Sequence, residues 1–547
     1  MGAFILGWER LKNKLPLVTF YAAAALFVYT VLNNAWVADD AFISMRHAQN
    51  LVLGNGLTFN PGERVQGFTN PLWTLVLAGA RVFTEDLLLF SFAAAGLIAI
   101  ALVLLLRRYS TSLYAGAGVL LFMSISKAFV EYSSSGLENA LAHLLICCFV
   151  LTACAKHSLP KLGSGSLRRY TLLSVLAGLV IVNRFDHALL VLPLWCFETV
   201  QLGWRKAWKP ALIGFSPLIA WCVFAVVYYG FLFPNTYYAK LSAGFDSAWY
   251  WERGLHYLRN SLDWDPITLV MILSVTLWAW LARSKRESVL MLGAVLYVLY
   301  VVKIGGDFMS GRFFSTPFIL ALLVGAQLVV HQVKSAREAA LGGMIPLLLV
   351  GFIVAPFNPV IRPLYNEKRP PIPNYEPAVA TADEALYYCP MTCLMNKQFH
   401  ESFWKRDRER AYVENLSPLE MPVVLTGGVG MVSYYNPQTR FVDVFALGDA
   451  LLARLPHDFA LQERDFRIGH IGRKVPAGYY ATLATGKNEI ASPCIRPLYD
   501  DLRAVIAGPL FTVERFAAWK RLTIDNRNYV DACRDPMGFM GYEHGWQ

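Results

Sequence analysis

The sequence has few charged residues for its length. Of its 547 residues, 16% are charged and 56% are hydrophobic, and the mean hydropathy is +0.40. Soluble globular domains carry about 25% charged residues, so the composition excludes that class for the chain as a whole and predicts a polytopic α-helical membrane protein. Basic cytoplasmic loops account for the net charge of +10, and we therefore expect no nucleic-acid partner.

Cysteine motifs and nucleotide-binding motifs are also missing. Cys389 and Cys393 have no following Cys or His pair at zinc spacing, so a disulfide or two free thiols are expected there. The glycine run at 426–430 lacks the G-x-G-x-x-G spacing of a dinucleotide-binding loop and is interpreted as a turn. No internal repeat or low-complexity tract is present.

Long apolar runs are abundant instead. Eleven are long enough to cross a bilayer, or nearly so, and they predict about eleven transmembrane helices. They cover residues 15–33, 86–106, 111–126, 137–155, 170–183, 188–203, 210–230, 266–282, 288–302, 313–331 and 339–356. Because the first run follows a basic segment, a cleaved signal peptide is an alternative that we disfavour. A shorter run, 71–83, carries Pro71 and Arg81 and suits an interfacial helix.

The charges between the runs predict an orientation. Loops on the same side as the N-terminus are short and rich in Lys and Arg, whereas the longer loops on the other side hold fewer. The positive-inside rule therefore predicts a cytoplasmic N-terminus and a C-terminal region on the outer side. Treating 71–83 as a span would place Arg107 and Arg108 outside, which argues against that choice.

The composition changes near residue 357, where Pro and Asn cluster. We expect a transmembrane domain over 1–356, with a first outer loop at 35–85, and a soluble outer domain over 357–547. Runs at 423–428 and 440–447 are typical of strands, and runs at 383–389 and 460–471 are typical of helices. These patterns predict a small α/β domain on the outer side.

Two adjacent carboxylates, Asp39 and Asp40, directly follow the first apolar run. Charges at the membrane exit of a helix are costly unless they are used, so we predict that this pair is catalytic. The alternative is an N-cap for the helix that follows. Either Asp could also hold a divalent cation, Mg²⁺ or Mn²⁺. Arg46 and His47 on the same helix are either solvated surface residues or part of the site.

The other polar motifs between the runs fall on the same predicted side. Activated sugars outside the cytoplasm must arrive on a lipid, so we predict a polyprenyl-phosphate-linked donor. Transfer from it needs a carboxylate base and cations for the leaving phosphate. The predicted phosphate-binding residues are Arg312, Lys240, Arg184 and Lys303. The predicted sugar- or acceptor-binding residues are Glu138, Asp186, Asn235, Tyr237, Asp307 and His470.

Simpler interpretations exist for several of these residues. Arg184 and Asp186 could pair only with each other, Tyr237 could belong to an interfacial aromatic belt, and His470 could be structural. Arg312 begins a predicted helix, where a positive charge opposes the helix dipole. Its presence there therefore favours a specific partner, and we predict a phosphate.

Several motifs together resemble a known family. They are DDAFISMRHAQNLVLGNGLTFNPGERVQGFTNPLW, SGLE, NRFD, PNTYYAK, GGDFMSGRF, VDVFALGDALLARLP and RIGH. In this order, from residue 39 to about 480, they resemble the GT-C glycosyltransferases of the mycobacterial terminal arabinofuranosyltransferase type. The resemblance implies a GT-C fold, a catalytic Asp pair in the first outer loop and a polyprenyl-phospho-arabinofuranose donor. It also implies the inner (plasma) membrane of a bacterium, and an envelope glycan or a pilin-like protein as acceptor.

A second functional class fits part of the pattern. A transporter or flippase for lipid-linked or small anionic substrates would also combine apolar spans with charged motifs. Transporters place such residues near the midplane in paired repeats, whereas here they lie at the ends of the runs. The leading hypothesis is therefore a glycosyltransferase that acts at the periplasmic face.

Overall fold

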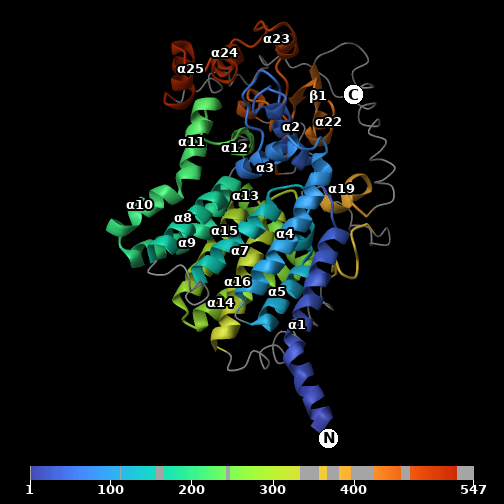
Figure 1. Cartoon of the computed structure of the whole chain (residues 1–547). Coiled ribbons are helices and arrows are strands. Elements are labelled where there is room, and N and C mark those ends of the chain that lie inside the picture. Colours follow the sequence, from blue (N-terminus) through green and yellow to red (C-terminus); the bar gives the residue numbers. More distant parts are fainter. Residues whose placement is uncertain are drawn as a thin grey trace.

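The computed structural model describes residues 2–110, 112–154, 166–241, 247–332, 356–365, 381–395, 423–456 and 468–525. These residues are mostly helical, and a bundle of long helices forms one half of the molecule (Figure 1). The long helices are α1 (Gly2–Asn33), α4 (Leu87–Tyr109), α5 (Leu113–Ile125), α7 (Asn139–Cys154), α8 (Ser166–Asn183), α9 (Ala188–Leu202), α14 (Pro266–Leu281), α15 (Lys285–Lys303) and α16 (Ser315–Gln332).

The first ten predicted runs are all helical, and nearly all of the eleventh, 339–356, lies outside the described residues. Fewer than eleven of these helices are long and apolar enough to be identified as membrane spans by length and composition alone. Within the described ranges, three helices meet that criterion, or five if two bent pairs each count as one span. Large apolar side chains such as Leu97, Leu104 and Leu273 are exposed on the bundle, as expected of lipid-facing positions. The chain is therefore a membrane protein with several apolar helices, and the count of eleven spans stays a prediction.

Helix α4 shows how the sequence determines the two ends of an apolar helix. The Asp86 carboxylate accepts a hydrogen bond from the Leu89 amide (3.0 Å) and thereby caps the first turn. Arg107 and Arg108 occupy the last turn, where their positive charges face the negative end of the helix dipole. The residues between these ends carry no charge, a composition that suits a helix whose termini alone meet water.

The predicted helix 210–230 is bent instead of straight. It consists of α10 (Trp204–Gly214) and α11 (Ser216–Tyr228), which meet at 55°. Pro217 has no amide hydrogen for the helical ladder, and it follows directly on the break. A Cβ at Gly214 would lie 2.2 Å from the Ser174 Cβ on α8, so this glycine permits close packing at the bend. A second pair, α13 (Ser247–Trp264) and α14, meets at 105° immediately before Pro266.

Short elements gather at one end of the bundle (Figure 1). From the first part of the chain these are α2 (Asp39–Val52), α3 (Pro71–Arg81) and α12 (Asn235–Leu241), while α6 (Lys127–Tyr132), η1 (Phe185–His187) and η2 (Arg312–Phe314) are short connections between helices of the bundle. From the last part they are α19 (Glu384–Thr392), β1 (Val423–Thr426), α22 (Gly430–Tyr435), β2 (Arg440–Asp443), η4 (Leu452–Arg454), α23 (Tyr479–Thr485), α24 (Ile495–Ile506) and α25 (Val513–Thr523). The run at 71–83 is thus a helix of 11 residues, α3.

The two predicted strands form a parallel pair. Val423 on β1 pairs with Arg440 on β2, and α22 supplies the crossover that a parallel pair requires. Helix α19 confirms the helical prediction for 383–389. The predicted helix at 460–471 is wrong where the structure describes it, because 468–470 form a turn and a bridge.

The last part of the chain packs onto the first outer loop. One hydrophobic core combines Phe42 of α2 and Trp73 of α3 with Ala385 of α19 and Met431 of α22. Cys389 and Cys393 form a disulfide in α19, and Cys494 is also disulfide-bonded. Loop 35–85 and the outer helices are therefore held as one packed unit, while the domain boundary at 356/357 stays a prediction.

Candidate functional site

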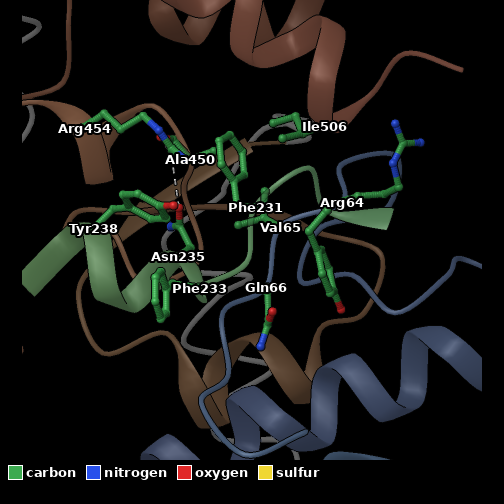
Figure 2. A pocket seen from close by; sticks show the side chains of 11 residues that line it. Arg64, Val65, Gln66, Phe231, Phe233, Asn235, Tyr238, Ala450, Arg454 and Ile506 are labelled. Carbon is green, nitrogen blue, oxygen red and sulfur yellow. Dashed lines mark hydrogen bonds between the residues drawn. The ribbon is translucent and has the colours of Figure 1, made fainter. Parts of the chain in front are cut away.

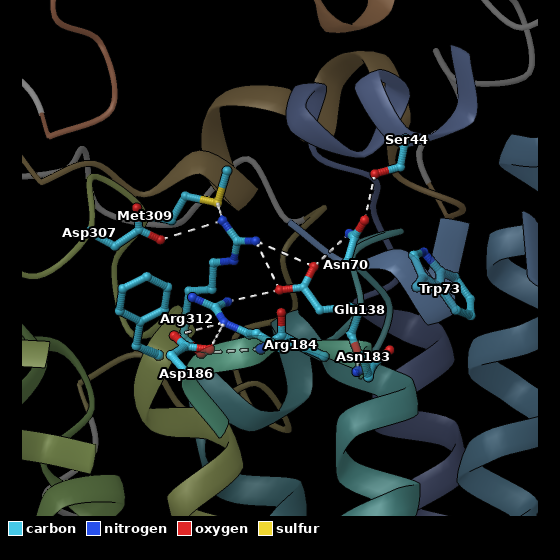
Figure 3. Close-up of polar contacts among 12 residues, drawn as sticks. Ser44, Asn70, Trp73, Glu138, Asn183, Arg184, Asp186, Asp307, Met309 and Arg312 are labelled. Atoms are coloured by element: carbon cyan, nitrogen blue, oxygen red, sulfur yellow. Dashed lines mark hydrogen bonds and ion pairs between the residues drawn. The ribbon is translucent and has the colours of Figure 1, made fainter. Parts of the chain in front are cut away.

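A buried carboxylate, Glu138, lies at the centre of the polar contacts where the helices meet the outer elements (Figure 3). Its Oε1 is 2.8 Å from Nη1 of Arg184 and 3.1 Å from Nη2 of Arg312. Its Oε2 accepts a hydrogen bond from the amide of Asn70 (2.9 Å). Glu138 is 0% exposed, so in this structure it acts as the shared counter-ion of two arginines. Its predicted role in sugar binding stays a prediction.

Asn70 was missed as a site residue, although it lies in the DDAFISM…TNPLW stretch. Its Oδ1 accepts hydrogen bonds from Ser44 and Thr74, both at 2.9 Å. These two donors orient the side-chain NH₂ toward Glu138. The Asn-Pro sequence at the start of α3 is the signal that could have revealed it. In the structure Asn70 occupies the N-cap position, but its side chain does not cap the helix and is used in the contacts with Ser44, Thr74 and Glu138.

Two further carboxylates complete the arginine contacts. Asp186 accepts two hydrogen bonds from Nε of Arg184, at 2.8 and 3.0 Å. Asp307 lies 3.5 Å from Nη1 of Arg312. The Arg184–Asp186 pair anticipated from the sequence is thus present, but it is part of a larger network. The partners of Arg312 explain why a positive charge is tolerated immediately before α16.

Electrostatics keep this network ionised. Burial alone would raise the pKa of Glu138, but the charges of Arg312 and Arg184, with the hydrogen bond from Asn70, lower it to about 2. Burial also opposes ionisation of Asp186, yet Arg184 lowers its pKa overall. Both carboxylates therefore stay charged at neutral pH and hold the arginines in place.

Asp40 faces this network with a free carboxylate. Burial raises its pKa, while the positive charges of Arg312 and Lys240 act in the opposite direction. Within the described part of the chain, no group donates a hydrogen bond to the Asp40 carboxylate, and the Lys240 ammonium has no hydrogen-bond or ion-pair partner. Both side chains are half-buried. A carboxylate and an ammonium near each other, each with unused hydrogen-bonding capacity, can receive a ligand.

Asp39 is arranged differently. Its two oxygens accept hydrogen bonds from the backbone amides of Gly430 (3.1 Å) and Met431 (2.7 Å) at the start of α22. Burial, together with the charge of Asp40, raises its pKa to about 7 despite these bonds. Neither Asp is the N-cap of α2, a position that Ala38 occupies. The alternative role as N-cap of their own helix is therefore wrong.

His470 lies beside the same group of residues. Its ring contacts Phe308 edge-on, with 4.3 Å between ring centroids, and contacts Phe445 at 4.8 Å. A Cβ on the preceding Gly469 would lie 3.4 Å from Nζ of Lys240. The structure thus brings His470 to the Lys240 side of the site.

Asn235 faces a separate pocket (Figure 2). This half-open pocket has about 240 Å³ of empty space, including its mouth. The Arg454 guanidinium lies over the rings of Phe231 (4.3 Å) and Tyr238 (4.5 Å) and donates to Oδ1 of Asn235 (3.4 Å). The Asn235 amide in turn donates to backbone carbonyls, including that of Ala446 (2.9 Å). These contacts join α12 to the loop after β2, and sugar binding by Asn235 stays a prediction.

Two predicted residues lie apart from the network. Lys303 is exposed in the last turn of α15. Tyr237 is 42% exposed and stacks on Phe233 with 4.7 Å between ring centroids. This placement of Tyr237 matches the interfacial-aromatic alternative. The structure brings neither residue into contact with Glu138 or its partners.

The interpretation of Arg46 and His47 as solvated residues is wrong. Both are 0% exposed. Arg46 donates hydrogen bonds to the carbonyls of Phe59 (2.7 Å), Ser433 and Thr439 (2.8 Å) and thereby joins α2 to the α22–β2 segment. Sequence position alone could not show the contacts to Ser433 and Thr439, because these acceptors lie almost 400 residues away.

A metal site is not evident in the part of the chain that the structure describes. No group of three or more His, Cys, Asp or Glu side chains there is arranged to hold an ion. The two Asp39 oxygens already accept amide hydrogen bonds. A divalent cation at Asp39 or Asp40 therefore stays a prediction, and we assign no chemical step to it.

Comparison with solved structures gives a weak likeness. Archaeal oligosaccharyltransferase AglB from Archaeoglobus fulgidus, in complex with an inhibitory peptide and a dolichol-phosphate, aligns with a TM-score of 0.45 and 10% identity over 80% of this chain and 65% of that chain. The same organism's oligosaccharyltransferase, tethered with an acceptor peptide, aligns with a TM-score of 0.46 and 12% identity over 92% of this chain and 72% of that chain.

Comparison of sequences is more informative, although no protein-family model matches. A terminal β-(1→2)-arabinofuranosyltransferase of Mycobacterium tuberculosis is 28% identical in an alignment of 349 residues that covers 55% of this chain and 54% of that protein. Its namesake from Corynebacterium glutamicum is 29% identical in an alignment of 394 residues that covers 62% of this chain and 54% of that protein. The chain spans about half the length of these curated relatives. It is therefore a distant homologue of the terminal β-(1→2)-arabinofuranosyltransferases, as its motifs predicted.

Proposed function

We propose that the chain is a membrane glycosyltransferase of GT-C type that moves a D-arabinofuranosyl group from a polyprenyl-phosphate donor to an acceptor on the periplasmic face. The acceptor is an envelope glycan or an exported, pilin-like protein. The observation that carries the proposal is the Asp40 carboxylate, which accepts no hydrogen bond from any described residue and on which the positive charges of Arg312 and Lys240 act. Distant homology to two arabinofuranosyltransferases supports the choice of sugar.

Asp40 is the general base in this proposal. The acceptor hydroxyl oxygen attacks the anomeric carbon, Asp40 takes the hydroxyl proton, and the bond from the anomeric carbon to the phosphate oxygen breaks. The phosphate leaves with the electron pair of that bond. A base within hydrogen-bonding reach contributes about 10²- to 10⁴-fold to such a step. A carboxylate to which no residue in the described ranges donates a hydrogen bond is available for this proton.

Lys240 and Arg312 receive the leaving phosphate. The Lys240 ammonium, which has no ion-pair partner among the described residues, offers three donors, and the Arg312 guanidinium is held by Glu138 and Asp307. Stabilisation by prepositioned cations needs little reorganisation during the reaction. Glu138 and Asp307 keep Arg312 in place, so they act on the phosphate through Arg312.

Two observations support a periplasmic site. The described cysteines of the outer elements, Cys389, Cys393 and Cys494, are disulfide-bonded, and disulfides persist in oxidising compartments. These elements lie at the same end of the bundle as α2, the helix that carries Asp40 (Figure 1). A lipid-linked donor in the outer leaflet reaches this end by lateral diffusion.

The test is transfer of radiolabelled arabinose from polyprenyl-phospho-arabinofuranose to an arabinan oligosaccharide, with the purified protein in lipid vesicles. Asp40→Asn keeps the side-chain volume and removes the base, so we expect a rate at least 100-fold lower. Asp263→Asn, on a largely exposed residue of α13, is the matched control and should transfer at the wild-type rate. Wild-type transfer by Asp40→Asn would contradict the assignment, and movement of the lipid donor across vesicles without transfer would favour a flippase.

A further inference from the structure

The Asp39 carboxylate joins the first outer loop to the last part of the chain. Both of its oxygens are used, one by the amide of Gly430 and one by the amide of Met431. Two hydrogen bonds to one carboxylate restrict its rotation. Because Asp39 immediately precedes Asp40 in the first turn of α2, this contact anchors the backbone that carries the free carboxylate.

Gly430 makes the contact possible. A Cβ at this position would lie 1.9 Å from the Asp39 carbonyl oxygen and 2.7 Å from its Cγ. These distances are far below van der Waals contact, and the atoms involved include backbone that cannot move freely. Any side chain at position 430 would therefore push α22 away from α2.

Other contacts bring the same two helices together. Phe42 of α2 packs against Tyr434 and Tyr435 of α22, with ring centroids 5.5 and 5.9 Å apart. Arg46, one turn further along α2, donates to backbone carbonyls at the end of α22. Of these contacts between α2 and α22, the Asp39 contact therefore lies nearest to Asp40.

The segment before α22 also reaches the wall of the site. A Cβ on Gly427, between β1 and α22, would lie 2.7 Å from the Phe445 ring. Phe445 contacts His470, and His470 contacts Phe308, the residue after Asp307. Movement of the β1–α22 segment would therefore disturb both the Asp40 backbone and this aromatic wall.

Successive side chains on a helix point about 100° apart. With Asp39 directed to α22, Asp40 points elsewhere, and the positive charges of Arg312 and Lys240 act on its carboxylate. We propose that Asp39 is a positioning residue, whose hydrogen bonds to Gly430 and Met431 hold α22 on α2 and so set the orientation of the Asp40 carboxylate. The proposal rests on the proposed glycosyltransferase function. It divides the labour within the Asp pair, with Asp40 as the base and Asp39 as the attachment point of the outer domain.

The experiment compares Asp39→Asn, Gly430→Ala and the double variant. Asp39→Asn replaces one acceptor oxygen by an NH₂ group that faces an amide N–H, and Gly430→Ala breaks the same contact while leaving both carboxylates intact. The free energy of a hydrogen bond to a charged group corresponds to about a 10- to 100-fold change in a rate constant. Loss of the Asp39 contact should therefore lower kcat by that factor. We expect this loss in each single variant, with KM for the polyprenyl-phosphate donor within about twofold. We expect little further loss in the double variant, because both changes remove one contact.

Two controls separate positioning from catalysis and from folding. Gly79→Ala, in α3, has nothing within 4 Å of the new Cβ and should behave as wild type. The pH profile of kcat/KM should keep the ascending limb of the base in Asp39→Asn and lose it in Asp40→Asn. An Asp39→Asn variant as inactive as Asp40→Asn, with a fully active Gly430→Ala variant, would overturn the proposal.

A structural measurement keeps the inference independent of the assay. Hydrogen exchange of the Gly430 and Met431 amides should accelerate in Asp39→Asn and stay unchanged in Gly79→Ala, as judged by mass spectrometry of the full-length protein in detergent. Unchanged protection in Asp39→Asn would refute the contact itself. Accelerated exchange in a protein whose wild-type form transfers no arabinose would support the contact and refute the proposed function.

Discussion

The buried position of Glu138 leads to a prediction about stability. In Glu138→Gln the side chain keeps its size but loses its charge, and the paired guanidinium groups of Arg184 and Arg312 lose their shared counter-ion. All three groups are at least nine-tenths buried, so water can replace the lost charge only poorly. Breaking a buried ion pair by removing one partner typically costs about 3 to 5 kcal/mol.

The pKa of Glu138 gives a second approach to the magnitude. A change from 4.5 to about 2 corresponds to about 3 kcal/mol of stabilisation at neutral pH, at about 1.4 kcal/mol for each pH unit. The sign follows from the lowered pKa. The stabilisation is fully present above pH 4.5, and it is lost as the pH falls toward 2. Both approaches agree on a loss of about 3 kcal/mol in Glu138→Gln.

The assay is thermal unfolding of the purified protein in detergent, followed by tryptophan fluorescence. We expect the apparent melting temperature of Glu138→Gln to fall by several degrees and transfer to fall with it, because Arg312 loses its orientation. Glu85→Gln is the matched control. It also removes one carboxylate from an ion pair with Arg81 (3.9 Å), but Glu85 is 89% exposed, and exposed ion pairs contribute little to stability. Equal melting temperatures for both variants would refute the role of Glu138 as the central counter-ion.

Three further predictions concern other parts of the molecule. Gly254→Ala should destabilise the α13–α15 contact by about 1 to 3 kcal/mol, because the new Cβ would lie 1.8 Å from the Val302 carbonyl oxygen; an unchanged melting temperature would contradict this packing. Arg46→Met should increase protease cleavage within 423–456 by leaving several backbone carbonyls without their donor, and a cleavage rate equal to wild type would count against that contact. The initial rate of transfer should rise with pH as Asp40 loses its proton, with a midpoint above the usual carboxyl value of 3.8 because burial raises its pKa; a rate that falls with pH over the same range would exclude Asp40 as the base.

Much of the architecture could be predicted from local patterns. Apolar runs fit helices because a segment in lipid must satisfy its own backbone hydrogen bonds, and each of the first ten predicted runs is helical. The strands β1 and β2 were predicted from short β-branched and apolar runs, whereas their parallel pairing was not. The turn at 426–430 was also anticipated, but not that it leads into the helix that contacts Asp39. The two bends could not be placed by hydropathy alone, because apolar composition continues through them.

The membership of the site was determined by the sequence only in part. Charged motifs at the ends of apolar runs led to the prediction of Asp40, Glu138, Arg184 and Arg312 as site residues, because charges near a bilayer are costly without a partner or a function. Which charges meet was decided by the tertiary structure. Glu138 pairs with Arg312 across 174 positions, and Asp39 bonds to amides about 390 positions away, and no local periodicity encodes such distances. The Asp pair could therefore be found in the sequence, but only the packing of α22 against α2 gives its two members different surroundings.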